Sequence, residues 1–283
     1  MTDLWRAVNW NQEGNNSVLS GLIKTAEEID LIRESCKIVS EVIDYIGKFV
    51  KEGISTKELD LLIEEYIISK EAYPAFKGYK VKKKAFPSSS CISVNEEVVH
   101  GLPGKRKLKS GDIISIDVGV KKNGYYGDGA YTFAVGEISP KTAKLLKVTE
   151  ESLYKGIEQA VDGNEVNDIS CAIQNYVEGS GYGIVRELVG HGIGKNLHED
   201  PAIPNFYSSG SSQKLYEGMV IAIEPMVNYG TFKVYEKSDG WTIVTKDHEP
   251  SAHFEHTVLV RKRKPEILTM TWCNNNSDYI DKK

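Results

Sequence analysis

Apolar residues recur at helical spacing in two pairs of segments, and each pair is followed by runs typical of β-strands. Capping-box patterns at Thr25 and Glu28, and again at Ser55 and Glu58, mark the first two helix starts. A Ser-Pro pair at 139–140 marks a third start, because proline is favoured at the first helical position. The pattern predicts helices over about 26–47, 56–69, 140–161 and 166–178.

The β-type runs complete the pattern and lie at 92–100, 113–133, 186–193, 219–223, 241–245 and 254–260. Before them, the segment 74–90 is loop-like and rich in lysine. The order of helices, strands, helices and strands predicts an α+β fold of two similar halves, although no sequence repeat links them. We expect three regions: an N-terminal arm at 1–21, a single domain at 22–268 and a C-terminal tail at 269–283.

Composition narrows the class of protein. The 283-residue chain has a net charge of −5, which argues against a nucleic-acid binder as a whole. The N-terminus lacks the apolar core of a signal peptide, and no apolar run approaches the length that spans a membrane. The four cysteines are widely separated and form no CxxC pair, so we expect reduced thiols and a cytoplasmic location.

The segment 116–128 is predicted to form a hairpin that carries two aspartates. Asn123-Gly124 favours a two-residue type I′ turn, which places Asp128 opposite Gly119. Asp117 and Asp128 then point to the same face, with Cα atoms roughly 7–8 Å apart, and the glycine leaves room between them. Two solvated aspartates are the alternative, and a bulge in the second strand would break the register. Aspartate is depleted in strands, which favours a pair that holds metal.

Three further candidate ligands lie in the second half of the chain. His191 stands among glycines, and Glu224 and Glu255 each interrupt an apolar run, where an unpaired charge is costly. Four carboxylates in one cavity would raise each other's pKa unless cations neutralise them. One imidazole and four carboxylates suit Mn, Fe, Co or Zn, and a pair of such ions can activate a bridging water for hydrolysis.

Several motifs together resemble type I methionine aminopeptidases over residues 22–268. They are PAFKGY at 74–79, CISVNEEVVHGLP at 91–103, GDIISIDV at 111–118, GHGIG at 190–194, HE at 198–199, EGM at 217–219, EP at 224–225 and SAHFEHT at 251–257. The resemblance implies the pita-bread fold, in which two pseudo-symmetric α/β halves surround a curved antiparallel sheet. It also implies two divalent metal ions, held by Asp117, Asp128, His191, Glu224 and Glu255.

The resemblance assigns roles to further residues. Glu224 is implied to shuttle a proton, His198 to stabilise the oxyanion, and His100 to bind the substrate backbone. From the residues alone, a structural role is the commoner interpretation of a lone histidine, and the functional roles of His100 and His198 rest mainly on the resemblance. The pocket implied for the methionine side chain is lined by Phe76, Tyr79, Phe86, Cys91, Leu197 and Trp241.

Two of the departures of the chain from the family pattern lie close to the expected site. The segment 80–85 puts six residues between Gly78-Tyr79 and Phe86-Pro87, where the family has about two. His253 stands where the family commonly has glutamine, and we interpret it, with His248 and His256, as structural or as lying outside the ligand shell.

The sequence thus predicts a cytoplasmic, monomeric aminopeptidase that removes the initiator methionine from nascent polypeptides, through attack by a hydroxide that bridges two metal ions. A Xaa-Pro aminopeptidase or prolidase of the same fold is one alternative, and a non-catalytic pita-bread binding protein is another. The ribosome is a candidate partner through the basic segments Lys80–Lys84 and Arg261–Lys264. No contact with a membrane is expected.

Overall fold

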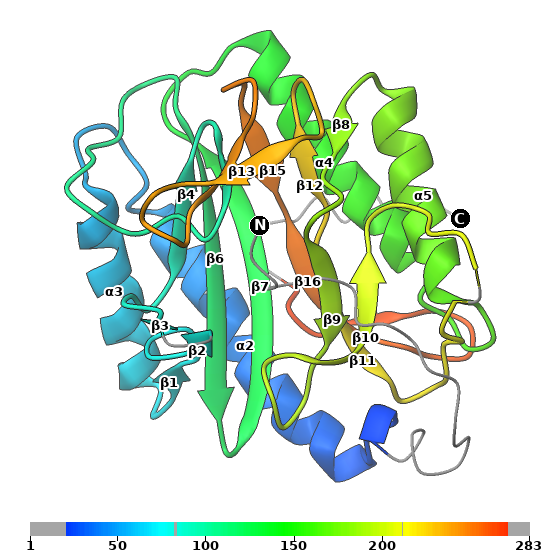
Figure 1. Ribbon diagram of the computed structural model, residues 1–283. Coiled ribbons are helices and arrows are strands. Elements are labelled where there is room, and N and C mark those ends of the chain that lie inside the picture. Colours follow the sequence, from blue (N-terminus) through cyan, green and yellow to red (C-terminus); the bar gives the residue numbers. More distant parts are fainter. Residues whose placement is uncertain (1–20, 82–83, 211, 271–283) are drawn as a thin grey trace.

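The main sheet of the protein has nine strands and joins the two halves of the chain (Figure 1). A computed structural model describes residues 21–81, 84–210 and 212–270. The predicted arm and tail fall almost wholly outside these residues, so the division of the chain at 21 and 268 stays a prediction. Among the residues described, no helix is both long enough and apolar enough to cross a membrane.

In the part of the chain that the structure describes, four long helices flank the sheet, two beside each half (Figure 1). Thr25 and Ser55 form the predicted capping boxes with Glu28 and Glu58. The third predicted helix ends at Ile157, four residues before the predicted end, because the chain leaves the helix there and Val161 forms a β-bridge with Arg261. The helices are α2 (Ala26–Gly47), α3 (Thr56–Ser69), α4 (Pro140–Ile157) and α5 (Val166–Gly179).

The described part of the first half contributes seven strands, more than the pattern predicted. The lysine-rich segment is not a plain loop, since β2 and β3 form a small separate hairpin. The predicted strand 92–100 is broken at Asn95, whose φ is +58° and whose side chain bonds Asp112 and the N–H of Ile113. The strands are β1 (Tyr73–Pro74), β2 (Lys80–Val81), β3 (Lys84–Ala85), β4 (Cys91–Val94), β5 (Glu97–Val99), β6 (Ile113–Lys122) and β7 (Tyr125–Ala134).

The described part of the second half contributes ten strands, none longer than six residues. Several of them carry no local signal because they contain two or three residues, and β10 includes two prolines. They are β8 (Gly183–Ile184), β9 (Val189–Gly192), β10 (Glu199–Pro204), β11 (Val220–Ile223), β12 (Met226–Asn228), β13 (Val234–Glu236), β14 (Ile243–Thr245), β15 (Ser251–His253), β16 (Glu255–Leu259) and β17 (Glu266–Ile267).

The hairpin of β6 and β7 has the predicted register. Gly119 pairs with Asp128, and Val120 pairs with Gly127, so no bulge interrupts the ladder. Asn123 and Gly124 both have positive φ, at 49° and 87°, as a type I′ turn requires. The hairpin therefore presents Asp117 and Asp128 on one face.

Packing of α2 against the sheet depends on Gly127 in β7. A Cβ atom at this position would lie 2.6 Å from the backbone nitrogen of Cys36 in α2 and 2.8 Å from its Sγ. We expect Gly127→Ala to lower the free energy of unfolding by about 1–3 kcal/mol, because the backbones must separate. Urea unfolding measures this.

Gly179→Ala is the matched control, because Gly179 in α5 has no neighbour within 4 Å of an added Cβ. It should be neutral or slightly stabilising, since alanine favours helix. Equal stability of both variants would contradict the packing argument.

Candidate metal centre and active site

Strand pairing brings the predicted ligands together from segments far apart in the chain. Across neighbouring strands, Asp117 pairs with Ala130, and Ala130 pairs with Glu255. Asp128 is two residues from Ala130 and so shares its face. Glu224 follows β11, whose last residue pairs beside Glu255, and His191 lies in β9 on the other side of β11. The antiparallel register therefore builds one cluster from five strands or strand ends.

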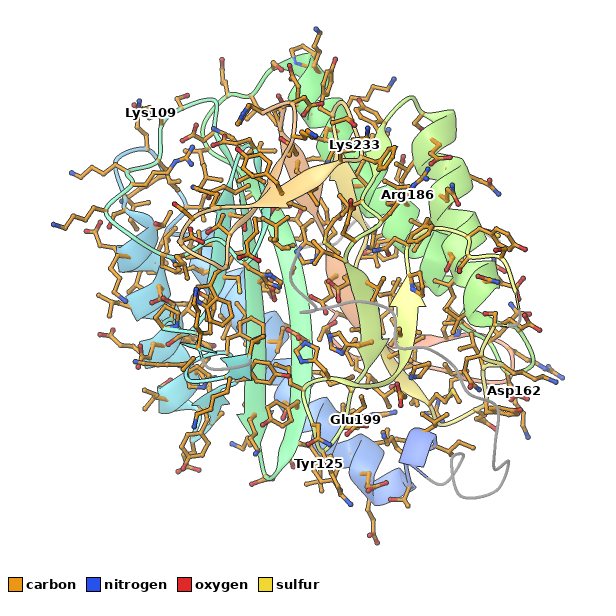
Figure 2. All side chains as sticks on the ribbon, in the orientation of Figure 1. Lys109, Tyr125, Asp162, Arg186, Glu199 and Lys233 are labelled. Carbon is orange, nitrogen blue, oxygen red and sulfur yellow. The ribbon has the colours of Figure 1, made fainter. Side chains whose placement is uncertain are left out.

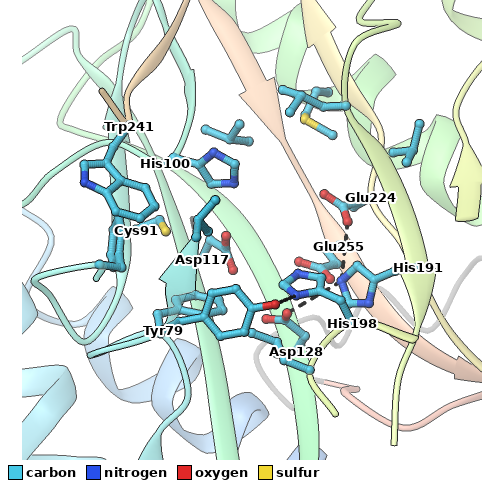
Figure 3. Close-up of a pocket in the computed structure, with 18 residues that line it drawn as sticks. Tyr79, Cys91, His100, Asp117, Asp128, His191, His198, Glu224, Trp241 and Glu255 are labelled. Carbon is cyan, nitrogen blue, oxygen red and sulfur yellow. Dashed lines mark hydrogen bonds and ion pairs between the residues drawn. The ribbon is translucent and has the colours of Figure 1, made fainter. Parts of the chain in front are cut away.

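The five side chains converge on one cavity (Figure 3). His191 Nε2 lies 3.9 Å from Asp128 Oδ2 and 3.8 Å from Glu224 Oε1. Possible ligand atoms of Asp128, His191 and Glu255 all lie within 4.8 Å of one another. Asp117 stands across the cavity from His191, on the side of Cys91 and Trp241 (Figure 3).

Burial makes the charged forms of these carboxylates costly. It raises the pKa of Asp128 to about 7, and burial together with the neighbouring Asp128 raises the pKa values of Asp117, Glu224 and Glu255 well above their ordinary range. Burial also lowers the pKa of His191 to about 4, so its imidazole is neutral at pH 7. Without a cation, the cluster would hold protons at neutral pH.

The donor atoms fit a divalent cation. Asp117 Oδ1 and Glu255 Oε1 are buried and have no hydrogen-bond partner among the residues that the structure describes. His191 Nδ1 lies 2.9 Å from the carbonyl oxygen of Gly192, which can only accept, so Nδ1 carries the proton. The lone pair of Nε2 then points at carboxylate oxygens, an arrangement that a metal ion between them would stabilise. Oxygen and imidazole donors without thiolate suit a hard or borderline transition metal.

The sequence led us to expect open space beside Gly119, but in the structure this space is filled. A Cβ atom there would lie 2.6 Å from the ring of Phe76, which packs over the strand between the two aspartates. The glycine therefore admits an aromatic wall of the cavity. Local spacing could not reveal this, because Phe76 comes from the segment before β2.

His198 lies at the edge of the cluster and contacts Tyr79. The Tyr79 hydroxyl and His198 Nδ1 form a 2.7 Å hydrogen bond, and the His198 ring lies edge-on to that of His191 (Figure 3). Burial, with His191 and His100 nearby, lowers the pKa of His198 well below its ordinary value. The ring is therefore neutral near pH 7.

His100 has a strained backbone at the opposite wall of the cavity. Its φ is +57°, in the left-handed region, and the next residue, Gly101, lies so close to Ile92 that a Cβ would meet the carbonyl oxygen at 2.2 Å. Burial lowers the pKa of His100 to about 4. The strain and close approach fix this histidine where it faces the cavity.

Every predicted pocket residue lines the same cavity as the cluster. Phe86 and Trp241 meet edge to face with ring centroids 5.1 Å apart, and burial keeps the Cys91 thiol neutral by raising its pKa. Sequence reasoning missed five apolar lining residues, because an isolated apolar residue carries no signal that separates pocket from core. They are Val81, Val99, Leu188, Val189 and Met226.

His253, interpreted from the sequence as structural or as lying just outside the ligand shell, is buried behind the cluster. Its Nε2 lies 3.6 Å from Glu224 Oε2, and neither ring nitrogen has a hydrogen-bond partner within the described structure. Only its place two residues before Glu255, on the same face of the chain, could have indicated this contact.

Known proteins match this chain over most of its length. The model of metallopeptidase family M24 matches residues 30–262. A methionine aminopeptidase of Clostridium acetobutylicum is 52% identical over 250 residues, which cover 88% of this chain and 98% of that protein. Methionine aminopeptidase 1 of Bacillus subtilis is 51% identical over 248 residues, with the same coverage of 88% and 98%.

Solved structures agree in fold. Methionine aminopeptidase from Rickettsia prowazekii has a TM-score of 0.84 at 40% identity, over 88% of this chain and 99% of that chain. Prolidase from Pyrococcus furiosus, at 24% identity, has a TM-score of 0.72 over 90% of this chain and 67% of its own, which indicates a shared fold alone. These matches confirm the predicted pita-bread fold. The chain belongs to metallopeptidase family M24, among its methionine aminopeptidases, as its motifs predicted.

Proposed function

We propose that this chain removes the N-terminal methionine from nascent polypeptides by metal-dependent hydrolysis. The observation that carries the proposal is the cluster of four carboxylates and His191 beside an aromatic and thiol-lined pocket. The names of the relatives, methionine aminopeptidases, agree with that chemistry. A non-catalytic binding protein would have no need of buried carboxylates that are costly to ionise.

The proposed metal site comprises two divalent ions, of Co, Mn, Fe or Zn. Asp117, Asp128, His191, Glu224 and Glu255 would hold these ions, since all five line one cavity. Such ions lower the pKa of water and polarise a carbonyl group when bound.

Three side chains of the chain would then guide the reaction. Glu224 would accept a proton from the attacking water and pass it to the leaving amine as the peptide bond breaks. For His198 to donate a hydrogen bond to the substrate, the Tyr79 hydroxyl would donate to His198 Nδ1, which leaves the imidazole proton on Nε2. His198 Nε2–H would donate to the carbonyl oxygen as negative charge develops there. His100 would hold the substrate backbone from the opposite wall.

The pocket would hold the methionine side chain, because a flexible thioether packs well against aromatic rings and sulfur. Tyr79, Cys91 and Trp241 are the proposed contacts, and all three line the cavity beside Asp117. Val81 of the short hairpin also lines the cavity, so the lysine-rich segment forms part of the wall.

Removal and return of metal tests the proposed function directly. We expect chelation to abolish cleavage of Met-Ala-Ser and add-back of Mn²⁺, Co²⁺, Fe²⁺ or Zn²⁺ to restore it, with no release of the first residue from a Xaa-Pro peptide. Chromatographic assay of free methionine measures both. Cleavage of Xaa-Pro peptides alone would favour the prolidase-like alternative. Absence of cleavage with every ion would leave the binding-protein alternative.

We further propose that the enzyme works as a cytoplasmic monomer that docks on the ribosome through its basic segments. Lys80 and Lys84 lie in the exposed β2–β3 hairpin. Reversing both charges to glutamate should weaken co-sedimentation with ribosomes by about tenfold at low salt, because fewer phosphate counterions are released. Turnover of a tripeptide should stay normal.

Lys37→Glu combined with Lys51→Glu, at two exposed positions away from the hairpin, is the control, because it makes the same change in net charge. Equal loss of co-sedimentation in the control would indicate a general charge effect, and unchanged co-sedimentation of the hairpin variant would contradict docking through this segment.

A further inference from the structure

We propose that Lys24 is a positioning residue for His198 and that it acts through Glu199. This inference rests on the role proposed above for His198. Lys24 comes just before α2, far along the chain from the loop that carries His198, since Lys24 and Glu199 are 175 positions apart. The two segments meet in a buried ion pair that the proposed chemistry does not use.

The ion pair is short and largely removed from water. Lys24 Nζ lies 2.6 Å from Glu199 Oε2, and the exposed fractions of the two side chains are 8% and 15%. Breaking such a pair leaves an uncompensated buried charge, so its geometry is strongly held. Glu199 directly follows His198, and any shift of its backbone moves His198 too.

The loop between 194 and 199 is built around the pair. The other carboxylate oxygen of Glu199 accepts from the N–H of Asn196 at 2.8 Å, and the N–H of Gly194 donates to the Asn196 carbonyl at 3.1 Å. A Cβ atom on Gly194 would lie 2.8 Å from Lys24 Cε and 2.9 Å from Glu199 Oε2. The glycine lets the loop close directly over the two charges.

Lys24 is itself fixed at both ends. Its backbone N–H donates to the carbonyl of Gly218 at 2.9 Å, and its Nζ donates to the carbonyl of Gly21 at 2.7 Å. Figure 2 shows Glu199 at the end of the molecule where α2 begins, the end at which Tyr125 and the β6–β7 turn also lie. The start of α2 therefore serves as a rigid support for the loop.

His198 is thus held from two sides. Its ring bonds the Tyr79 hydroxyl through Nδ1, and its backbone is anchored through Glu199 to Lys24. Without Lys24, the hydrogen bond to Tyr79 would remain but the backbone anchor would be lost. A displacement of His198 by about 1 Å is enough to cost a large part of its catalytic effect.

The same two segments share a second ion pair that supplies a matched control. Lys195 Nζ lies 3.0 Å from Glu28 Oε1, but the Lys195 side chain is 66% exposed. Exposed pairs hold their partners weakly. Removal of this pair should leave the position of His198 unchanged, although it also joins the start of α2 to the loop.

A double-mutant cycle with His198 tests the proposal in the metal-loaded enzyme. We expect Lys24→Met to lower kcat on Met-Ala-Ser by about 10- to 100-fold with little change in KM, and Lys195→Met to change it less than about twofold. In the His198→Ala background, Lys24→Met should cost less than about twofold, because the residue that it positions is gone. Calorimetric titration with Mn²⁺ should give the same affinity for Lys24→Met and wild type.

Amide hydrogen exchange gives a readout apart from activity, and exchange over 193–199 should be faster in Lys24→Met than in wild type or Lys195→Met. Glu199→Gln, which keeps the bond to Asn196, is the second variant should Lys24→Met fail to fold, and the same losses are expected of it. Equal costs of Lys24→Met with and without His198, or weakened Mn²⁺ binding, would overturn the proposal. Inactive wild type would instead contradict the proposed function.

Discussion

Glu224→Gln is expected to lower kcat on a methionyl tripeptide by about 10²- to 10⁴-fold, the range typical of a lost general acid–base group. Glutamine keeps the size of the side chain and one neutral oxygen donor, but it cannot accept a proton and release it again. Burial and the neighbouring Asp128 raise the pKa of Glu224, which suits a group that must hold a proton in one step and give it up in the next.

The same substitution should stabilise the protein in the absence of metal. It removes one of four buried carboxylates whose charged forms are costly, so the thermal midpoint of the metal-free variant should rise above that of wild type. Steady-state kinetics at saturating Mn²⁺ and thermal unfolding after chelation measure the two effects. Opposite signs for activity and stability are typical of active-site residues.

Glu178→Gln is the control. Glu178 lies near the end of α5, away from the cavity, and makes an exposed ion pair with Arg186. It should leave turnover and the thermal midpoint unchanged. Calorimetric titration with Mn²⁺ separates loss of metal from loss of proton transfer in Glu224→Gln. Turnover of that variant at the wild-type rate with metal bound would show that Glu224 does not carry the proton.

Much of the site could be predicted from the sequence because its strongest signals are local. Asn123-Gly124 fixes a turn, the turn fixes the register of β6 and β7, and the register sets Asp117 and Asp128 on one face. Glutamates inside apolar runs indicate buried charge wherever they occur, since such charge requires a partner. Strongly amphipathic helices with capping boxes can likewise be predicted without knowledge of tertiary contacts.

What the sequence could not predict depends on pairing between distant segments. β10 contains an acidic pair and two prolines, and it becomes a strand only because β9 lies beside it. The ion pair of Lys24 and Glu199 joins residues 175 positions apart, and neither residue differs by local pattern from a solvated one. Gly119 is a third case, because the reason for its small size is the ring of Phe76, which packs against it from another segment.

The stability of the metal-free protein is expected to fall as the pH rises from 6.5 to 8. The pKa of Asp128 is raised from 3.8 to about 7, and the pKa values of Asp117, Glu224 and Glu255 are raised well above their ordinary range. The folded state therefore binds more protons than the unfolded state, and stability is lost as pH rises through these pKa values. Each tenfold change in proton affinity corresponds to about 1.4 kcal/mol.

Buried histidines act in the opposite direction at lower pH. Burial lowers the pKa values of His100, His191 and His256 to about 4 and of His253 to about 3, so their contribution to stability grows as pH rises from about 4 to 6.5 and is then complete. The two effects oppose each other below pH 6.5. Only the carboxylates are left to lower stability between pH 6.5 and 8, which makes this the informative window.

Bound metal should remove that loss. A divalent ion at about 100 times its dissociation constant stabilises the folded state by about 2.7 kcal/mol, which corresponds to about 5–10 °C in a protein of this size. Because binding displaces protons from the carboxylates, the increase in thermal midpoint on addition of Mn²⁺ should be larger at pH 8 than at pH 6.5. Calorimetric scans with chelator and with Mn²⁺ at both values measure it.

Asp128→Asn is the variant that connects the pH effect to the cluster. It should flatten the fall in stability of the metal-free protein between pH 6.5 and 8, because it removes the carboxylate whose pKa lies in that window. It should also abolish most of the stabilisation by Mn²⁺, since Asp128 is one of three residues whose possible ligand atoms lie within 4.8 Å of one another. Parallel pH profiles for metal-free and Mn²⁺-loaded wild type would instead show that these buried carboxylates are not where the ion binds.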